Sequence, residues 1–116
     1  MTESRDVQVV IREMLDHIDY VLDKTRDLSR YDFQTDRDIQ QSVERSLEII
    51  SEASRLLPSD LKQTEPEIPW RKVADFGNVL RHAYFGVNPD IVWRIATEDL
   101  VPLRQALLTL QSNSAQ

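Results

Sequence analysis

The sequence predicts an all-α fold in which four main helices and one short turn form an antiparallel up-down bundle. Glycine accounts for only 2 of the 116 residues and aromatic side chains for 7% of them, which disfavours a turn-rich β fold. Apolar residues recur at three-and-four spacing in four stretches that short connections join. Residues 1–116 should therefore make up one domain, since single domains usually have about 100 to 200 residues.

Long apolar stripes predict the first two helices. The stripe of residues 6–28 consists of Val7, Val10, Ile11, Met14, Leu15, Ile18, Val21, Leu22 and Leu28. Residues 29–36 contain turn formers, so we expect a loop there, with Thr35 as the N-cap of the next helix. This helix should run to Leu57, before Pro58, with a stripe made of Ile39, Val43, Leu47, Ile50, Ala53 or Ser54, and Leu57.

A third helix is predicted after a short turn over residues 60–66, which Ser59 is expected to cap. The helix should begin with Pro69 at its first position, where the missing N–H of proline costs nothing. It should extend through Tyr84. Its expected apolar face comprises Trp70, Val73, Phe76 or Gly77, Leu80 and Tyr84.

The last helix has the strongest start signal in the chain. Asn88 is a predicted N-cap, Pro89 fixes the first helical residue and Asp90 adds a negative charge to the first turn. The expected stripe comprises Ile91, Val92, Ile95, Leu100, Leu103, Ala106, Leu107 and Leu110. Pro102 should force a kink or a restart within this helix, and residues 111–116 should form a frayed tail.

Composition limits the kinds of site that the chain can hold. It has no cysteine and only two histidines, so we expect neither disulfides nor a thiolate or histidine-rich metal site. Charged residues interrupt every apolar stretch near the start, which argues against a signal peptide or a membrane span. The interpretation is a cytoplasmic protein with no membrane partner, no metal and no cofactor.

The formal charge of −6 disfavours broad coating of nucleic acid, but the charge is uneven. Residues 1–69 carry nine basic and sixteen acidic side chains, whereas residues 70–94 carry four basic side chains and two acidic ones. The only net-positive window therefore includes the end of the third helix and the start of the last. An ordinary solvated face is the alternative reading of so small a difference.

A polar line is predicted on the third helix. Steps of four, three and four residues return to nearly the same side of a helix, and they join Arg71, Asp75, Asn78 and His82. An imidazole can take or give a proton near neutral pH. With an arginine beside it, it suits metal-free RNA cleavage, in which a base deprotonates the ribose 2′-hydroxyl, an acid protonates the leaving oxygen and a cation stabilises the phosphorane.

His82 and Tyr84 can also have purely structural roles. A histidine in the last turn of a helix is often there because its cation favours the helix C-terminus. Tyr84, at an apolar position, can equally be a core aromatic with its hydroxyl at the rim.

Three segments of the chain resemble one family, the HepT-like branch of the HEPN proteins. They are "VERSLEIISEASRLLP" (43–58), "PEIPWRKVADFGNVLRHAYFGV" (66–87) and "DIVWRIATEDLVPL" (90–103). The resemblance implies a HEPN-like helical bundle that forms a homodimer and acts as the toxin of a toxin–antitoxin pair. The toxin would be a metal-independent endoribonuclease with a tRNA or mRNA substrate, and the antitoxin a nucleotidyltransferase of the MNT type.

The resemblance also assigns roles to residues. The family motif is an arginine, four to six residues, a histidine, one residue and a tyrosine, and His82 and Tyr84 occupy its last two places. His82 would be the acid or base, Asn78 and Arg81 would hold phosphate, and Tyr84 would accept AMP from the antitoxin, which neutralises the toxin. Arg71, about 16 Å from His82 along the helix, would contact a remote part of the substrate or the other protomer's site.

One position departs from the family motif, which leaves alternatives to the toxin. Gly77 stands where the motif has its arginine, five residues before His82. Arg81 is a possible substitute, although it projects about 100° away around the helix. The alternative function is a non-catalytic HEPN domain that binds a nucleotide or serves as the acceptor subunit of a nucleotidyltransferase complex. A plain structural bundle, with the motif as packing, is the third reading.

Overall fold

The computed structural model describes residues 4–81 and 88–114, and all the regular structure within them is helical, which confirms the all-α fold. The described elements, in chain order, are α1 (Ser4–Thr25), α2 (Arg30–Thr35), α3 (Arg37–Ser54), α4 (Ser59–Gln63), α5 (Trp70–Arg81), α6 (Pro89–Arg94), the π-helical turn η1 (Ile95–Asp99) and α7 (Leu100–Ser114).

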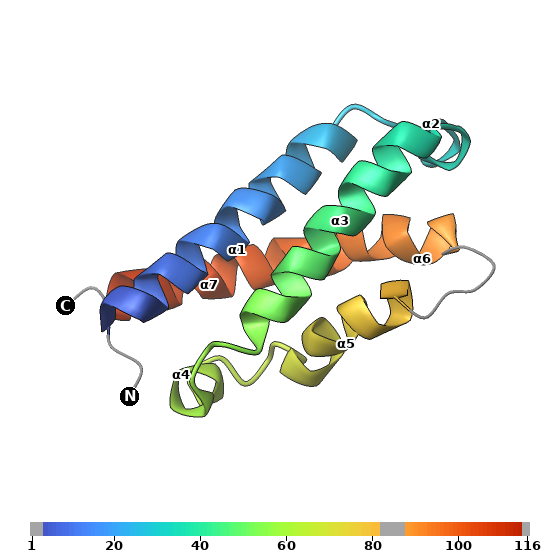
Figure 1. Cartoon of the computed structure of the whole chain (residues 1–116). Helices are drawn as coiled ribbons and strands as arrows, with labels where there is room; N and C mark the ends of the chain where they lie inside the picture. Colours follow the sequence, from blue (N-terminus) through green and yellow to red (C-terminus); the bar gives the residue numbers. More distant parts are fainter. Residues whose placement is uncertain (1–3, 82–87, 115–116) are drawn as a thin grey trace.

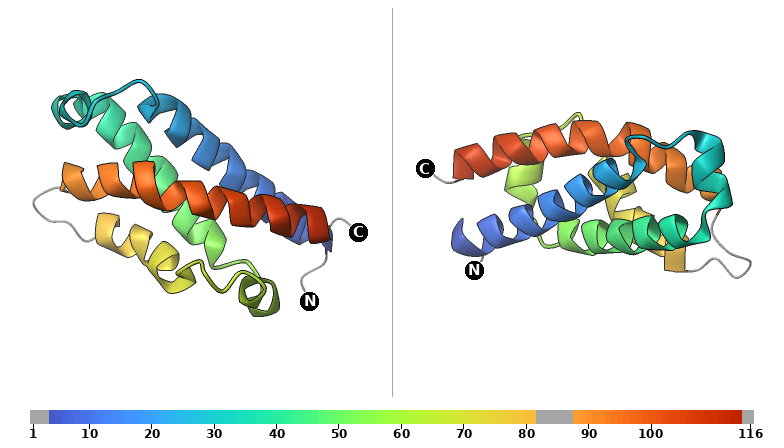
Figure 2. Two further views of the ribbon diagram at one scale, coloured as in Figure 1. Left: turned by 180° about the vertical axis from the view of Figure 1, so that it is seen from behind. Right: turned by 90° about the horizontal axis from the view of Figure 1, so that it is seen from above.

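Four long helical runs form the bundle, as the sequence predicts (Figure 1). α1 and α3 lie side by side and run in opposite directions, and α5 packs on α3. α6, η1 and α7 follow one another without a break and form the fourth run, which contacts α1 through η1 and α7 and contacts α2 and α3 through α6. The start of α1 and the end of α7 lie together at one end of the molecule (Figure 2), where the Gln8 side chain donates a hydrogen bond to the Gln111 carbonyl oxygen (3.2 Å). The end of α5 and the start of α6 lie at the other end.

The predicted apolar stripes form one continuous core. The largest fully buried side chains are Ile11, Met14, Ile18, Val21, Phe33, Val43, Leu47, Ile50, Leu100, Leu103, Leu107 and Leu110. On α5, Val73 and Phe76 are buried, as the stripe predicts, and Gly77 is buried beside them. Ile91 is the exception in the last helix, because 43% of its surface is exposed and it does not join the core.

The loop predicted over residues 29–36 is instead a short helix, α2. Ser29 is its N-cap, with a capping box in which the Ser29 hydroxyl accepts from the Asp32 N–H and the Asp32 carboxylate accepts from the Ser29 N–H. Phe33 is fully buried and packs against Trp93 of α6 in a tilted arrangement, with ring centroids 5.4 Å apart and 43° between the ring planes. The N-cap of α3 is consequently Asp36, which accepts from the Ile39 N–H, and the prediction of Thr35 for this position is wrong.

Three other predicted boundaries differ from the structure. Ser59 does not cap a turn but is the first residue of α4, after Pro58 in the N-cap position. α5 begins at Trp70, so Pro69 precedes the first helical residue, and its carbonyl oxygen accepts from the Val73 N–H. α7 continues to Ser114, so residues 111–114 are helical rather than frayed.

A π-helical turn stands just before Pro102, where the sequence predicts a kink or a restart of the last helix. Proline lacks an N–H, and its ring clashes with the carbonyl group four residues earlier, here that of Glu98. The backbone widens over Ile95–Asp99, and the Leu100 N–H donates to the carbonyl oxygen of Ile95, five residues back. This wider turn relieves the crowding and lets the helix continue.

A buried serine joins α3 to α5. The Ser51 hydroxyl donates to the Ala74 carbonyl oxygen (2.7 Å) and accepts from the Gly77 N–H (3.0 Å), and Ser51 is only 1% exposed. The Arg55 guanidinium donates to the same Ala74 carbonyl oxygen (2.9 Å). Because Gly77 has no Cβ, the hydroxyl can reach the α5 backbone at this point.

A polar clamp fixes the start of α6 against α2. Asp90, in the first turn of α6, accepts hydrogen bonds from Arg30 (3.1 Å) and Gln34. The hydrogen bond from Arg30 is the largest of the causes that lower the pKa of Asp90 below its ordinary value. The Asn88 side chain caps the same turn by accepting from the Asp90 N–H (2.9 Å), which confirms the predicted cap.

Gly77→Ala should destabilise the protein even though alanine is the better helix former. Alanine gains up to about 1 kcal/mol of helix propensity. Its methyl group competes for the space of the Ser51 hydroxyl, and overpacking of this kind costs about 1–3 kcal/mol. We expect a net loss of about 1 kcal/mol in the free energy of unfolding, measured by urea denaturation. In a Ser51→Ala background the methyl group should cost less, so an equal gain in stability in both backgrounds would contradict the packing described above.

The clamp should make a pH-dependent contribution to stability. Since the pKa of Asp90 is lower in the folded than in the unfolded chain, the contribution is present above about pH 4 and is lost as the pH falls through the lowered value. Asp90→Asn should therefore lower the melting temperature at pH 7 and have little effect below about pH 3. Asp27→Asn is the matched control, because Asp27 is exposed and has no ion pair in the described part of the chain. An Asp90→Asn deficit that persists unchanged in acid would show that the ionised carboxylate is not responsible.

Candidate functional site

The polar line predicted on α5 is an exposed face of that helix, as far as the helix is described. Arg71, Asp75 and Asn78 are all exposed, whereas Val73 and Phe76 on the opposite side are buried. Arg81 is the last residue of α5, but its side chain lies outside what the structure describes, as do His82 and Tyr84. The structure therefore brings Arg71, Asp75 and Asn78 together on one face and leaves the placement of the other candidates open.

The segment that carries His82 and Tyr84 joins two helices with well-defined positions. α5 leads into it and packs on α3 through Ser51 and its neighbours. α6 follows it, capped by Asn88 and clamped through Asp90. Arg71 lies at the far end of α5, about 15 Å from Arg81 along the axis.

Gly77 belongs to the buried side of α5, not to the exposed line. Its N–H bonds the Ser51 hydroxyl of α3, and the residue is buried. A side chain at position 77 would start from inside the contact between the two helices. Position 77 therefore supplies no cation to the exposed surface of α5. Among the described side chains of α5, the cationic ones are Arg71 and Lys72.

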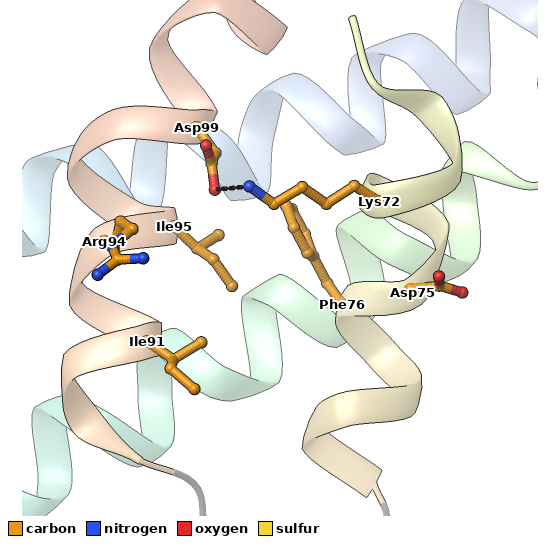
Figure 3. Close-up of a pocket in the computed structure, with 7 residues that line it drawn as sticks. All are labelled: Lys72, Asp75, Phe76, Ile91, Arg94, Ile95 and Asp99. Carbon is orange, nitrogen blue, oxygen red and sulfur yellow. Dashed lines mark ion pairs between the residues drawn. The ribbon is translucent and has the colours of Figure 1, made fainter.

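A pocket lies between α5 and the run formed by α6 and η1 (Figure 3). Its volume is about 160 Å³, and its main lining residues are Lys72, Phe76, Ile91, Arg94, Ile95 and Asp99. The Lys72 ammonium and the Asp99 carboxylate form an ion pair across it, with 3.4 Å between Nζ and Oδ2. Asp75 also lines the pocket, but its carboxylate points away from the other charged groups.

Sequence patterns alone do not predict this pocket. Its residues come from helices about twenty positions apart in the chain, and apolar spacing assigns Phe76 and Ile95 simply to the core. One sequence signal points to this pocket. Ile91 and Asp99, one apolar and one charged residue, each stand four positions from Ile95, which is helical spacing. Their alignment depends on the π turn, which the sequence does not predict.

The described residues hold neither a candidate metal-binding cluster nor a helix suited to cross a membrane. Residues 4–81 and 88–114 contain no cluster of three or more histidine or carboxylate side chains arranged to bind a metal ion. In the same residues, no helix combines the length and the apolar character needed to cross a bilayer.

The family match and the similar proteins all carry ribonuclease names. The family described as "Ribonuclease HepT-like" matches residues 14–110. "Probable ribonuclease HepT" of Thermococcus cleftensis is 39% identical over 94 residues, which cover 81% of this chain and 86% of that protein. "Putative RNase MJ1380" of Methanocaldococcus jannaschii is 33% identical over 102 residues, covering 88% and 94% of the two chains. "Putative RNase TTE0752" of Caldanaerobacter subterraneus subsp. tengcongensis is 32% identical over 98 residues, covering 81% and 88%.

No solved structure gives a significant match to this chain. The family match spans most of the chain, from the middle of α1 to the last turns of α7, and the relatives are matched over most of their own lengths. On this evidence, the chain belongs to the HepT-like ribonuclease family.

Proposed function

We propose that this protein is an endoribonuclease that cleaves RNA without a metal ion. The observation that carries the proposal is the family match over residues 14–110, which includes the His82 and Tyr84 pair that follows α5 in the sequence. The relatives described above carry the names "Probable ribonuclease HepT" and "Putative RNase MJ1380", which supports the same activity here.

The proposed chemistry is an internal transfer at phosphorus. A base takes the proton of a ribose 2′-hydroxyl, the 2′-oxygen attacks the neighbouring phosphorus, and the bond to the 5′-oxygen breaks as an acid protonates that oxygen. The products are a 2′,3′-cyclic phosphate and a 5′-hydroxyl end. His82 supplies one proton-transfer group, and Asn78 and Arg81 stabilise the charge on the phosphorane.

A homodimer completes this site in the proposal. The reaction needs both an acid and a base, and each chain offers one histidine in the motif. A two-fold axis that brings the two motifs to one cleft supplies two histidines and doubles the local positive charge. Arg71, at the other end of α5, then contacts a more distant phosphate of the RNA or the partner's site.

We further propose that the protein is the toxin of a toxin–antitoxin pair. Its antitoxin is a nucleotidyltransferase of the MNT type, which transfers AMP to the Tyr84 hydroxyl. The added phosphate places bulk and negative charge beside His82, so it repels the RNA phosphate that the site must hold.

A second candidate function is a non-catalytic acceptor subunit of the nucleotidyltransferase. The burial of position 77 against Ser51 favours it, because the place of the motif arginine offers no cation to a substrate. In this case AMP transfer to Tyr84 occurs but RNA cleavage does not.

His82→Ala should reduce RNA cleavage by about 10²–10⁴-fold, the range for loss of a general acid or base. Arg81→Ala should also reduce the rate, because Arg81 takes the place of the motif arginine. The measurement is the cleavage of purified tRNA and total RNA by protein that carries no AMP. His17→Ala is the matched control, since His17 is the only other histidine and hydrogen-bonds Ser46 between α1 and α3 (3.2 Å). Equal cleavage by wild type and His82→Ala would disprove the catalytic role, and no cleavage by either would favour the acceptor subunit.

Co-expression with an MNT-type nucleotidyltransferase should add the mass of one AMP group to the intact protein, and Tyr84→Phe should remove this increment. Tyr31→Phe is the control, because Tyr31 is 72% exposed and tests whether accessibility alone selects the acceptor. Loss of the increment in Tyr31→Phe but not in Tyr84→Phe would refute the assignment of the acceptor.

A further inference from the structure

Two arginines lie close to one carboxylate where α6 begins. Asp90, in the first turn of α6, accepts hydrogen bonds from Arg30 and Gln34 of α2, and Nη2 of Arg30 lies 2.9 Å from its Oδ1. Arg94 stands four residues after Asp90 on the same helix, and residues at this spacing are neighbours on a helix surface. The start of α6 therefore holds two positive charges around one negative charge.

The charge of Arg94 remains when the other two charges cancel. The hydrogen bond from Arg30 is the largest of the causes that lower the pKa of Asp90, and the charge of Arg94 lowers it to a smaller degree. Asp90 is thus already bound by Arg30. Arg94 is exposed, and among the described residues it forms no ion pair with a carboxylate, Glu98 one turn further on included.

Arg94 also lies near the face of α5 that meets RNA in the proposed function. It is exposed at the opening of the pocket between α5 and α6, together with Asp75 of α5, whose carboxylate points away from it (Figure 3). Asp75 belongs to the exposed line of α5, with Asn78 about one turn further along. An RNA strand that runs along this line from Asn78 towards Arg71 therefore passes the side of the pocket on which Arg94 stands.

A guanidinium at this place suits a phosphate ligand. It carries a fixed positive charge and parallel N–H donors that match two phosphate oxygens. Position 77, which is buried against Ser51, supplies no such group. Because the chain as a whole has a formal charge of −6, a strand of RNA needs a cation without a partner where it binds.

We propose that Arg94 binds a backbone phosphate that flanks the cleaved one, and that Arg30 keeps Arg94 available for this contact by neutralising Asp90. Without Arg30, Asp90 is free to pair with Arg94 along the helix. Arg94 is then a binding residue, and Arg30 is a positioning residue that does not contact the RNA. The inference rests on the proposed ribonuclease function, because it names an RNA contact outside the motif.

Binding can be measured without cleavage by using labelled single-stranded 2′-O-methyl oligonucleotides, which lack the 2′ proton that the reaction removes. Arg94→Ala should weaken binding about fivefold at about 0.1 M salt, the effect of one charged hydrogen-bonding contact. The slope of log affinity against log salt should fall by about 0.7 for each copy of Arg94 that the strand contacts. The loss should be equal for chains of A, C and U, since a phosphate contact carries no sequence information.

Two further variants serve as controls for Arg94→Ala. Arg94→Lys keeps the charge, so it should keep the salt slope of wild type. Arg37→Ala removes an exposed arginine at the start of α3 that forms no ion pair with another described residue. It should change the affinity by less than about twofold.

The role of Arg30 has its own test. Arg30→Ala should weaken binding about two- to threefold, because Asp90 then pairs with Arg94. Adding Asp90→Asn should restore the wild-type affinity, since an amide does not hold the guanidinium by charge, although the clamp between α2 and α6 stays broken. Adding Asp27→Asn instead removes the same charge from an exposed position elsewhere and should not restore it. Circular dichroism checks that each variant is folded, and light scattering gives its oligomeric state.

Several results would overturn the inference. An unchanged affinity and salt slope in Arg94→Ala, or a loss confined to one base, would overturn the phosphate contact. A change of oligomeric state in Arg94→Ala would assign the residue to a contact between protomers instead. A loss in Arg30→Ala that Asp90→Asn does not restore would show that the clamp acts only through the fold.

The outcomes also separate this inference from the proposed function. The expected pattern of binding in a protein that never cleaves RNA would support the Arg94 contact and remove the catalytic function. Cleavage of RNA by wild type, with binding unchanged in Arg94→Ala, would overturn the contact and leave the ribonuclease intact.

Discussion

Pro102 stands in the longest helical run of the molecule, and the arrangement around the candidate site depends on how the backbone accommodates it. An ordinary α-helix would bring the carbonyl of Glu98 against the proline ring. The π turn over Ile95–Asp99 avoids this contact and changes the rotation between α6 and α7. α7 can then pack along α1, while α6 faces α2 and α3. A local steric problem thereby sets which side chains face α5.

Two further contacts hold the elements that flank the motif segment. The Ser51 hydroxyl binds the backbone of α5 from inside the bundle, and Arg30 holds the first turn of α6 from its surface. The first contact is buried and neutral, so neither salt nor pH should affect it strongly. The second is exposed and ionic, so it is open to solvent and easier to break. The two sides of the motif are thus restrained by interactions of different kinds.

The sequence predicted those parts of the fold that depend on long or local patterns. The stripe of α1 spans about six helical turns, and the Asn88 cap depends only on its immediate neighbours, so both could be predicted from the sequence. α2 was not, because six residues with one buried side chain, Phe33, show no period, and its stability comes from Trp93 far along the chain. The exposed line of Arg71, Asp75 and Asn78 followed from spacing on one helix. The pocket did not, since it requires two helices and a π turn, and the burial of Gly77 became clear only with Ser51 in place.

The contact between Gln8 and Gln111 puts the first turns of α1 beside the last turns of α7, at the end of the bundle remote from the α5–α6 junction. A short peptide could join these two helices without crossing the polar face of α5. The bundle is therefore suited to circular permutation, with new ends opened in the exposed connection between α1 and α2. It is equally suited to carrying a fused domain at either end, because an attached domain would lie away from the candidate site.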